Sequence, residues 1–355
     1  MPIKLNFGSR TPAAFSRERK EGQEKADRSR ILPLPTNRDI NGSTPSQLAK
    51  NFPGAHWRNV EKAMGELDQL IGLAEVKRLI REAVAFTEIQ RVRARENLRS
   101  EPLSLHMIFK GNPGTGKTTV ARMIGKIFKE LGVLNKGHLV EVERADLVGE
   151  YIGHTAKKTR EQLKKALGGV LFIDEAYSLA RGGEKDFGRE AIDCLVKGME
   201  DHREEFILIL AGYRDEMEFF IRSNPGLRSR FSVIMEFPDY SLEELMKIAC
   251  LMFHQKQYRL TLEAKVKLEK ILCKWIFSGY NRNGNARLAR IIAETAIRRQ
   301  AYRLMERGME LHRDNLLQIT AEDLLEPDQP VFYSQLADQE QLIWEDSGIK
   351  EIVRE

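Results

Sequence analysis

Segment 111–118, which reads GNPGTGKT, has the residues and the spacing that bind a nucleotide phosphate. An apolar run at 103–109 predicts a buried strand before it, and a helical pattern follows to about residue 131. In that setting backbone N–H groups and the helix N-terminus face phosphate oxygens. Lys117 would reach the β- and γ-phosphates and the Thr118 hydroxyl would ligate Mg²⁺. The loop therefore predicts a nucleoside triphosphate site.

A pair of carboxylates supplies the second half of that chemistry. The apolar run 169–173 leads directly to Asp174 and Glu175. At the end of a strand beside the loop, Asp174 would hold Mg²⁺ through water and Glu175 would act as general base on the attacking water. A helix cap is the alternative for such a pair taken alone. With the loop, the pair favours ATP hydrolysis over kinase chemistry, since nothing indicates a pocket for a substrate hydroxyl.

Strands and helices alternate around these motifs. The apolar runs predict buried strands, and helical periodicity predicts helices between them. Such alternation is typical of a parallel sheet with helices on both faces, the α/β class. The strands are expected at 103–109, 138–142, 169–173, 206–211 and 233–237. The helices are expected from the end of the loop at 118 to about 131 and at 155–167, 189–199 and 215–221, with two more between 60 and 86 around a turn at 68–73.

The pattern changes after Pro238, where no further strand is predicted. Ser241 and Glu244 form a capping-box signature, and helical patterns run over 241–257, 262–277, 285–307 and 320–326. We therefore expect an α/β domain at 59–238 and a small all-helical domain at 239–326. An N-terminal arm (1–58) and a C-terminal tail (327–355) flank them.

Composition places the chain among globular proteins. Of 355 residues 42% are hydrophobic and 31% charged, and mean hydropathy is -0.42. We expect no transmembrane span and no secretory signal, because no apolar run is long enough or suitably placed. Three scattered cysteines, Cys194, Cys250 and Cys273, suit neither a disulfide framework nor a CxxC metal site. They fit reduced thiols in a cytoplasm.

Charge is distributed unevenly along the chain. Residues 1–60 carry 11 Lys and Arg against 5 Asp and Glu, and residues 326–355 carry 2 against 8. The intervening 61–325 carry 44 against 39, so they lack the excess that marks a nucleic-acid-binding domain. The Pro-rich arm is expected to be mostly disordered, either as a solvated tail or as a basic docking arm. The tail is acidic.

Several segments together resemble AAA+ ATPases. They are the loop GNPGTGKTT at 111–119, DEA at 174–176 and NPGLRSRF at 224–231. More narrowly, VGEYIGHT at 148–155, FILILAGYR at 206–214 and FPDY at 237–240 resemble the CbxX/CfqX family, which includes red-type rubisco activases. Segments 144–155 and 178–188 are similar to its sporulation members. The resemblance covers about 65–310 and implies an AAA+ P-loop fold with a helical lid, ATP and Mg²⁺ as cofactors, and a homo-oligomer, expected to be a hexamer.

The resemblance also implies roles for single residues. Arg230 matches the arginine finger that reaches a neighbouring subunit's γ-phosphate, with Arg228 as the alternative, and Arg287 matches the sensor-2 arginine. Tyr213 occupies the sensor-1 position, where many AAA+ proteins have Asn or Thr, so its role in positioning water stays open. Segment 71–72 matches the linker near adenine. The full set expected to bind the cofactor is Ile71, Gly72, Gly111, Asn112, Pro113, Gly114, Thr115, Gly116, Lys117, Thr118 and Thr119.

Segment 151–153 bears on what the ATPase acts on. Tyr151, Ile152 and Gly153 resemble the aromatic–hydrophobic–glycine pore loop of AAA+ hexamers that thread polypeptides, although a buried Tyr-Ile pair is the structural alternative. The Gly-rich segment 181–187 is either a second channel loop or a solvated connection.

A motor that remodels a protein client, acting in sporulation, is the function expected. A nucleic-acid motor and a nucleotide switch are the alternatives: near-balanced charge disfavours the first and Glu175 the second.

Overall fold

The computed structural model describes residues 55–100, 104–151, 153–181, 187–277, 284–308 and 312–325. All of them belong to one compact unit, Ala49–Glu355. The acidic tail and residues 1–54 of the expected arm lie outside the described residues. The last four residues of that arm are helical, because α2 (Ala55–Asp68) begins at Ala55.

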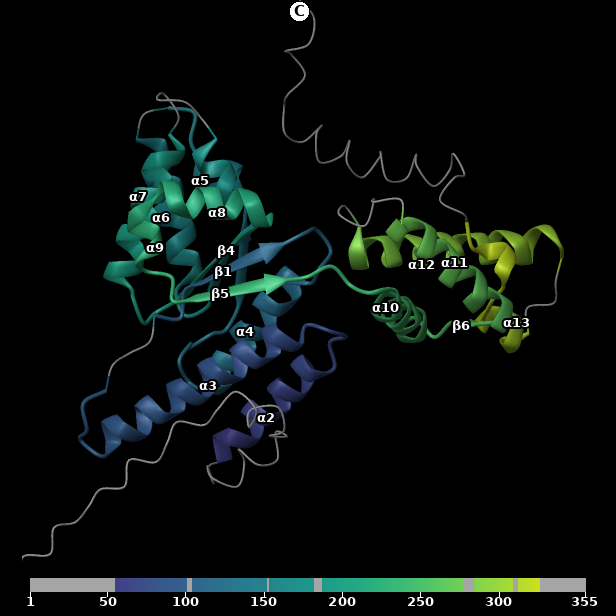
Figure 1. Ribbon diagram of the computed structural model, residues 1–355, viewed down its shortest axis with the longest axis horizontal. Helices are drawn as coiled ribbons and strands as arrows, with labels where there is room; N and C mark the ends of the chain where they lie inside the picture. The colour runs from purple at the N-terminus through teal and green to yellow at the C-terminus, as the bar shows by residue number, and fades with distance from the viewer. Residues whose placement is uncertain are drawn as a thin grey trace, which may run out of the picture. The chain divides into compact units, whose positions relative to one another are not determined.

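Five parallel strands form the sheet that carries the candidate site (Figure 1). They are β1 (Met107–Gly111), β2 (Leu139–Val142), β3 (Val170–Ile173), β4 (Ile207–Gly212) and β5 (Val233–Phe237). Their order is β2-β3-β4-β1-β5, with Met107 opposite both Ile209 and Val233. The predicted parallel sheet is therefore confirmed, with the strand before the phosphate loop in its interior.

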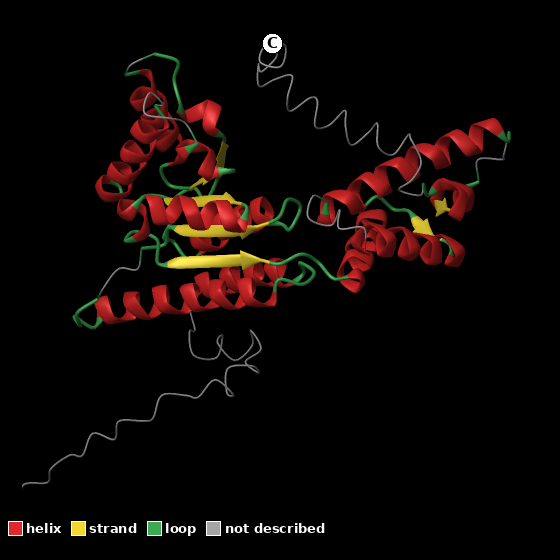
Figure 2. Ribbon diagram, turned by 45° about the horizontal axis from the view of Figure 1, so that its top comes forward, coloured by secondary structure: helices red, strands yellow, loops and turns green. Residues whose placement is uncertain are grey.

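Helices cover both faces of this sheet (Figure 2). Because residues alternate between the faces, Ile108, Leu171 and Leu208 join one apolar core, while Phe109 packs on Phe172 and Phe237 in another. Strands covered on both faces read as continuous apolar runs, which is why they were predictable. The long helices around the sheet are α3 (Ala74–Arg95), α4 (Lys117–Glu130), α6 (His154–Ala166), α7 (Gly188–Asp201) and α8 (Arg214–Ser223).

Three short helical turns were not predicted. They are α5 (Arg144–Leu147), η1 (Ala176–Ala180) and α9 (Pro225–Arg228), each of four or five residues. A single turn is too short to show helical periodicity, so nothing in the apolar pattern marks it. All three lie in segments that the sequence analysis linked to function.

The second domain is mainly helical, but it also contains strands. Its helices are α10 (Leu242–Gln255), α11 (Leu262–Phe277), α12 (Asn285–Glu306) and α13 (Arg313–Leu317), and the predicted Ser241–Glu244 capping box is present. The expectation of no strand after Pro238 is wrong, because β6 (Arg259–Leu260) pairs in parallel with β7 (Gln318–Ile319). Instead of a helix over 320–326, the chain forms the 3₁₀ turn η3 (Ala321–Asp323). Two-residue strands carry no alternation that a sequence could display.

None of the helices in the described residues is long and apolar enough to cross a membrane.

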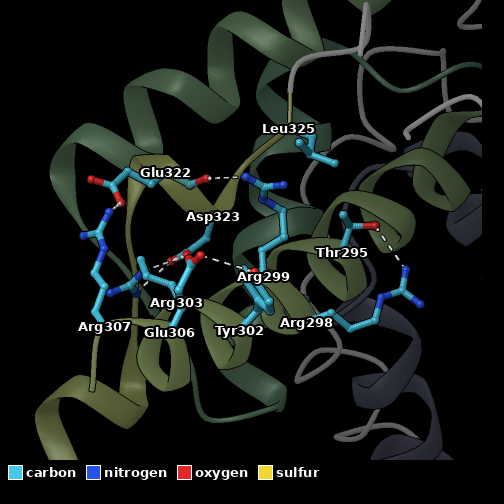
Figure 3. Close-up of a pocket in the computed structure, with 10 residues that line it drawn as sticks. All are labelled: Thr295, Arg298, Arg299, Tyr302, Arg303, Glu306, Arg307, Glu322, Asp323 and Leu325. Atoms are coloured by element: carbon cyan, nitrogen blue, oxygen red, sulfur yellow. Dashed lines mark hydrogen bonds and ion pairs between the residues drawn. The ribbon is translucent and has the colours of Figure 1, made fainter. Parts of the chain in front are cut away.

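A buried ion pair joins α12 to η3 beside a pocket of about 420 Å³ in this domain (Figure 3). Asp323 is 1% exposed and accepts hydrogen bonds from Arg303 Nε at 2.8 Å and Nη2 at 2.9 Å. The Thr320 N–H and hydroxyl donate to the same carboxylate, at 2.8 and 3.0 Å. Nearby, Arg307 and Glu322 form a second pair, which is solvent-exposed.

Removing the buried carboxylate should destabilise the protein. We expect Asp323→Ala to lower the free energy of unfolding by about 3 kcal/mol, because it removes the buried carboxylate that pairs with Arg303, whose side chain is 12% exposed. Glu322→Ala breaks the exposed pair with Arg307 and serves as the control, with an expected loss of at most ~1 kcal/mol. Urea denaturation measures both, and equal losses would contradict the assignment.

Candidate nucleotide-binding site

The phosphate loop is a turn between β1 and α4 whose backbone favours glycine at two positions. Gly114 and Gly116 have φ of +74° and +95°, in the left-handed region where a side chain is strained. A Cβ on Gly114 would also collide with the carbonyl oxygen of Gly284, at the start of α12. The glycines of the motif thus allow both the turn and the close approach of the helical domain.

Lys117, the first residue of α4, lies inside the loop. Its Nζ donates to the carbonyl oxygens of Gly111 and Asn112, both at 2.9 Å. Burial lowers the pKa of Lys117, and the carboxylates of Asp174 and Glu175 partly offset that effect. A phosphate entering the loop would provide a stronger acceptor than these two carbonyls.

Asp174 and Glu175 follow β3 at the same edge of the sheet. The Asp174 N–H donates to the Val142 carbonyl at 3.1 Å, and the Glu175 N–H donates to Asp174 Oδ1 at 3.0 Å. Glu175 is exposed and has φ of +46°, a strained conformation for a residue with a side chain. Such strain is often found where a reactive side chain must be held in one direction.

Negative charge gathers around this pair. Burial raises the pKa of Glu143, and Asp174, Asp146 and Glu175 raise it further. The Thr118 hydroxyl lies 3.4 Å from Glu141 Oε1. Within the described residues no three His, Cys, Asp or Glu side chains are placed to hold a metal ion by themselves. The donors fit Mg²⁺ that keeps phosphate and water ligands besides Thr118 and Asp174.

Tyr213 and Arg287 lie near the carboxylates. Burial raises the pKa of Tyr213, and the charges that act on it include Glu175, which raises the pKa, and Arg287, which lowers it. Arg287 also lowers the pKa of Lys117, so its charge acts across the loop. The structure therefore brings both predicted sensor residues toward the Lys117 and Glu175 region.

One neighbour of Glu175 was missed by sequence reasoning. Tyr177 is buried, its ring centroid lies 6.0 Å from that of Tyr213, and the Arg181 guanidinium lies 4.5 Å over its ring. Burial and the charge of Glu175 raise the pKa of its hydroxyl. In the sequence, an aromatic residue two positions after Glu175 resembles any core residue, so no signal distinguished it.

The predicted adenine segment also lies at the loop. A Cβ on Gly116 would be 3.6 Å from a methyl carbon of Leu73, the residue after segment 71–72. Gly72 has φ of +68°, and a Cβ there would collide with the Glu244 carboxylate of α10. Ile71 is half-buried. This part of the linker therefore lies between the phosphate loop and the helical domain.

The predicted finger arginines and the predicted pore-loop tyrosine contact residues other than those of the nucleotide site. Arg230 donates to the Gly226 carbonyl at 2.6 Å and pairs with Glu200 of α7, while Arg228 is exposed. Tyr151 is 66% exposed and its ring lies edge-on to His154 at 5.4 Å, so the alternative of a buried tyrosine does not hold. Ile152 and residues 182–186 lie outside the described part of the chain.

Comparison with known proteins gives two family models that match consecutive parts of the chain. The model of the AAA family, "ATPase family associated with various cellular activities", matches residues 107–239, and that of the AAA lid domain matches 241–332. Stage V sporulation protein K of Bacillus subtilis (strain 168) is 52% identical over 81% of this chain and 89% of its own.

Two further relatives have similar coverage. Protein CbbX of Cereibacter sphaeroides is 50% identical over 74% of this chain and 84% of its own. The chloroplastic ribulose bisphosphate carboxylase/oxygenase activase of Cyanidioschyzon merolae (strain NIES-3377 / 10D) is 46% identical over 75% and 91%.

The geometry predicts that binding and turnover can be separated by mutation. We expect Lys117→Ala to abolish nucleotide binding, because the buried ammonium is the main positive charge in the loop. Glu175→Gln should keep binding and lose ATP turnover by ~10²–10⁴, the usual contribution of a general base. Calorimetric titration with ADP and a phosphate-release assay measure the two effects. Normal turnover in Glu175→Gln would show that another group accepts the proton.

Proposed function

The chain belongs to the AAA family of ATPases, together with stage V sporulation protein K and the CbxX-type proteins, and from this premise we propose that it is a ring-forming motor that pulls on a polypeptide client. The predicted family, α/β fold with helical lid, and ATPase activity are confirmed. The observation that carries the rest of the proposal is the exposed aromatic side chain of Tyr151.

Tyr151 lies on a short loop with a fixed base. The Gly149 N–H donates to the buried Thr155 hydroxyl at 2.9 Å, which ties the start of the loop to α6. Gly153 has φ of +83° and open space around its Cβ position. An exposed ring on such a loop can press against an extended chain by packing alone, and several copies around a channel would hold it without reading its sequence.

The hydrolytic roles follow from the site. AAA ATPases bind ATP with Mg²⁺. In this chain Lys117 and the loop N–H groups would bind the phosphates, Thr118 and Asp174 would hold Mg²⁺, and Glu175 would accept the proton of the attacking water. Bound Mg²⁺ would neutralise charge that develops on the phosphates. Arg287 would bring positive charge from the helical domain.

Arg230 supports assembly into a ring, which we propose to be a hexamer. Its side chain is 28% exposed and is held by Glu200, while Arg287 is the arginine whose charge acts on Lys117 and Tyr213. An arginine finger supplied by a neighbour stabilises transition-state charge only after assembly.

The 52% identity to a sporulation protein supports a role in sporulation. The free cysteines, Cys194, Cys250 and Cys273, support a cytoplasmic location.

The finger assignment predicts complementation between two inactive variants. Arg230→Ala should bind ATP almost normally and lose hydrolysis by ~10³ or more. When it is mixed with Lys117→Ala protein, some interfaces combine an intact loop with an intact finger, so activity should partly return. Arg228→Ala tests the alternative finger in the same segment and should keep hydrolysis. Full ATPase activity of a dilute monomer would contradict the ring.

The pore-loop assignment predicts that a variant can lose client remodelling and keep ATP hydrolysis. Tyr151→Ala should keep basal ATP turnover, because the ring is exposed and its loop is fixed through Thr155 rather than through Lys117 or Glu175. It should abolish remodelling of a captured client. Tyr302→Ala is the control, since Tyr302 is 67% exposed but lies on the helical domain. Equal remodelling by both variants would contradict the proposal.

Salt dependence separates a polypeptide client from nucleic acid. In the Glu175→Gln background, polypeptide binding through Tyr151 should weaken little as salt rises. Single-stranded DNA binding would weaken steeply, because each phosphate contact releases counterions. Tight, salt-sensitive DNA binding with stimulated ATPase in the wild type would favour a nucleic-acid motor instead.

A further inference from the structure

Asn285, the first residue of α12, connects three segments of the chain. It is completely buried. Its Nδ2 donates to Asp239 Oδ1 at 2.8 Å and to the Pro113 carbonyl at 3.3 Å, and its Oδ1 accepts from the Tyr240 N–H at 3.0 Å. Asp239 also accepts from Asn112 Nδ2 at 2.9 and 3.0 Å. One amide and one carboxylate thus link the phosphate loop, the segment after β5 and the helical domain.

Two more hydrogen bonds continue this connection along the loop. The Ala286 N–H donates to the Gly114 carbonyl at 3.1 Å, and the Tyr240 hydroxyl donates to the Thr115 carbonyl at 3.1 Å. Together with the bond from Asn285, they bind three successive loop carbonyls, those of residues 113, 114 and 115. All three donors come from outside the loop.

Peptide geometry gives this arrangement a consequence for phosphate binding. In a trans peptide the N–H of one residue points opposite to the carbonyl of the residue before it, and the described residues contain no cis peptide. Holding the carbonyls of 113, 114 and 115 therefore turns the N–H groups of 114, 115 and 116 to the other side of the loop. Those N–H groups are the donors that a phosphate loop needs.

The backbone conformation of Asn285 suits its place at the start of α12, against the phosphate loop. Its φ is +40°, a left-handed conformation that asparagine tolerates better than most residues with a side chain. Arg287 follows two residues later in the first turn of α12. The position of this arginine is therefore fixed by the same hydrogen bonds that hold the loop carbonyls.

We propose that Asp239 and Asn285 are positioning residues that preorganise the phosphate loop and fasten the first turn of α12, with Arg287, against it. The proposal rests on the proposed nucleotide site and extends it, since it makes the start of the helical domain part of the phosphate-binding structure. Both residues act through the loop. Diphosphate binding should depend on them as well as triphosphate binding.

The test measures ADP affinity of the full chain, where no hydrolysis occurs. Asn285→Gly removes the side-chain amide and keeps the left-handed backbone accessible. We expect it to weaken ADP binding ~10-fold or more, as for loss of a hydrogen bond to a charged group. Asn97→Gly is the matched control, because Asn97 also has positive φ, at +54°, but is exposed near the end of α3. It should leave ADP affinity unchanged.

A charge exchange separates positioning from general stability. Asn285→Asp puts a second carboxylate beside Asp239 and should weaken ADP binding more than Asn285→Gly does. Adding Asp239→Asn to Asn285→Asp returns a donor and an acceptor to the pair, so affinity should rise again by several-fold. A double variant no better than Asn285→Asp would overturn the proposal.

Further outcomes are equally decisive. Unchanged ADP affinity in folded Asn285→Gly would overturn the role of the pair. If that variant does not fold, Asp239→Asn alone, at a solvent-accessible carboxylate, should still weaken ADP binding several-fold, and normal affinity there would overturn it. A wild type that binds no ADP, or Lys117→Ala that binds ADP normally, would instead contradict the nucleotide site itself.

Discussion

Parallel pairing of five strands is the constraint on which the candidate site depends. Because every strand of the order β2-β3-β4-β1-β5 runs in the same direction, the residues that follow β1, β3, β4 and β5 meet at one edge. The phosphate loop, the Asp174–Glu175 pair and Tyr213 come directly after strands, and Asp239 follows β5 with one residue between. None of them needs a long loop to reach the others. This edge, outside the carboxyl ends of the strands, is where open α/β sheets bind ligands.

Side chains of both charges lie at this edge of the sheet. Burial disfavours the ammonium form of Lys117, and the Asp174 and Glu175 carboxylates oppose that effect. Burial raises the pKa of Glu143, and the same carboxylates raise it further, which reflects an excess of negative charge on the side of the site next to β2. In the proposed function a divalent cation would relieve that excess, and the nucleotide phosphates would compensate Lys117 and Arg287.

The parts of the site that sequence predicts are those with local signals. The loop has fixed spacing, and Asp174 and Glu175 follow an apolar run, so each could be assigned without knowing its partner. Asp239 and Asn285 had no such signal, since an acid after a strand and an asparagine at the start of a helix are common in turns and caps. Their partners lie far along the chain, as do Glu200, which pairs with Arg230, and Tyr213, whose ring lies near that of Tyr177. Two-residue strands and single-turn helices also escaped prediction, because they are shorter than any period.

The two arginines proposed to act on nucleotide are held in different ways. Arg287 lies in the first turn of a helix that is hydrogen-bonded to the phosphate loop of its own chain, so its position depends on that loop. Arg230 is paired with Glu200 at the end of α7, and α7 packs on η1, the turn that directly follows Glu175. Continuous packing thus connects the end of β3 with the segment that carries Arg230. In a ring, the strand that presents the hydrolytic carboxylates of one site would then also support the arginine offered to the next.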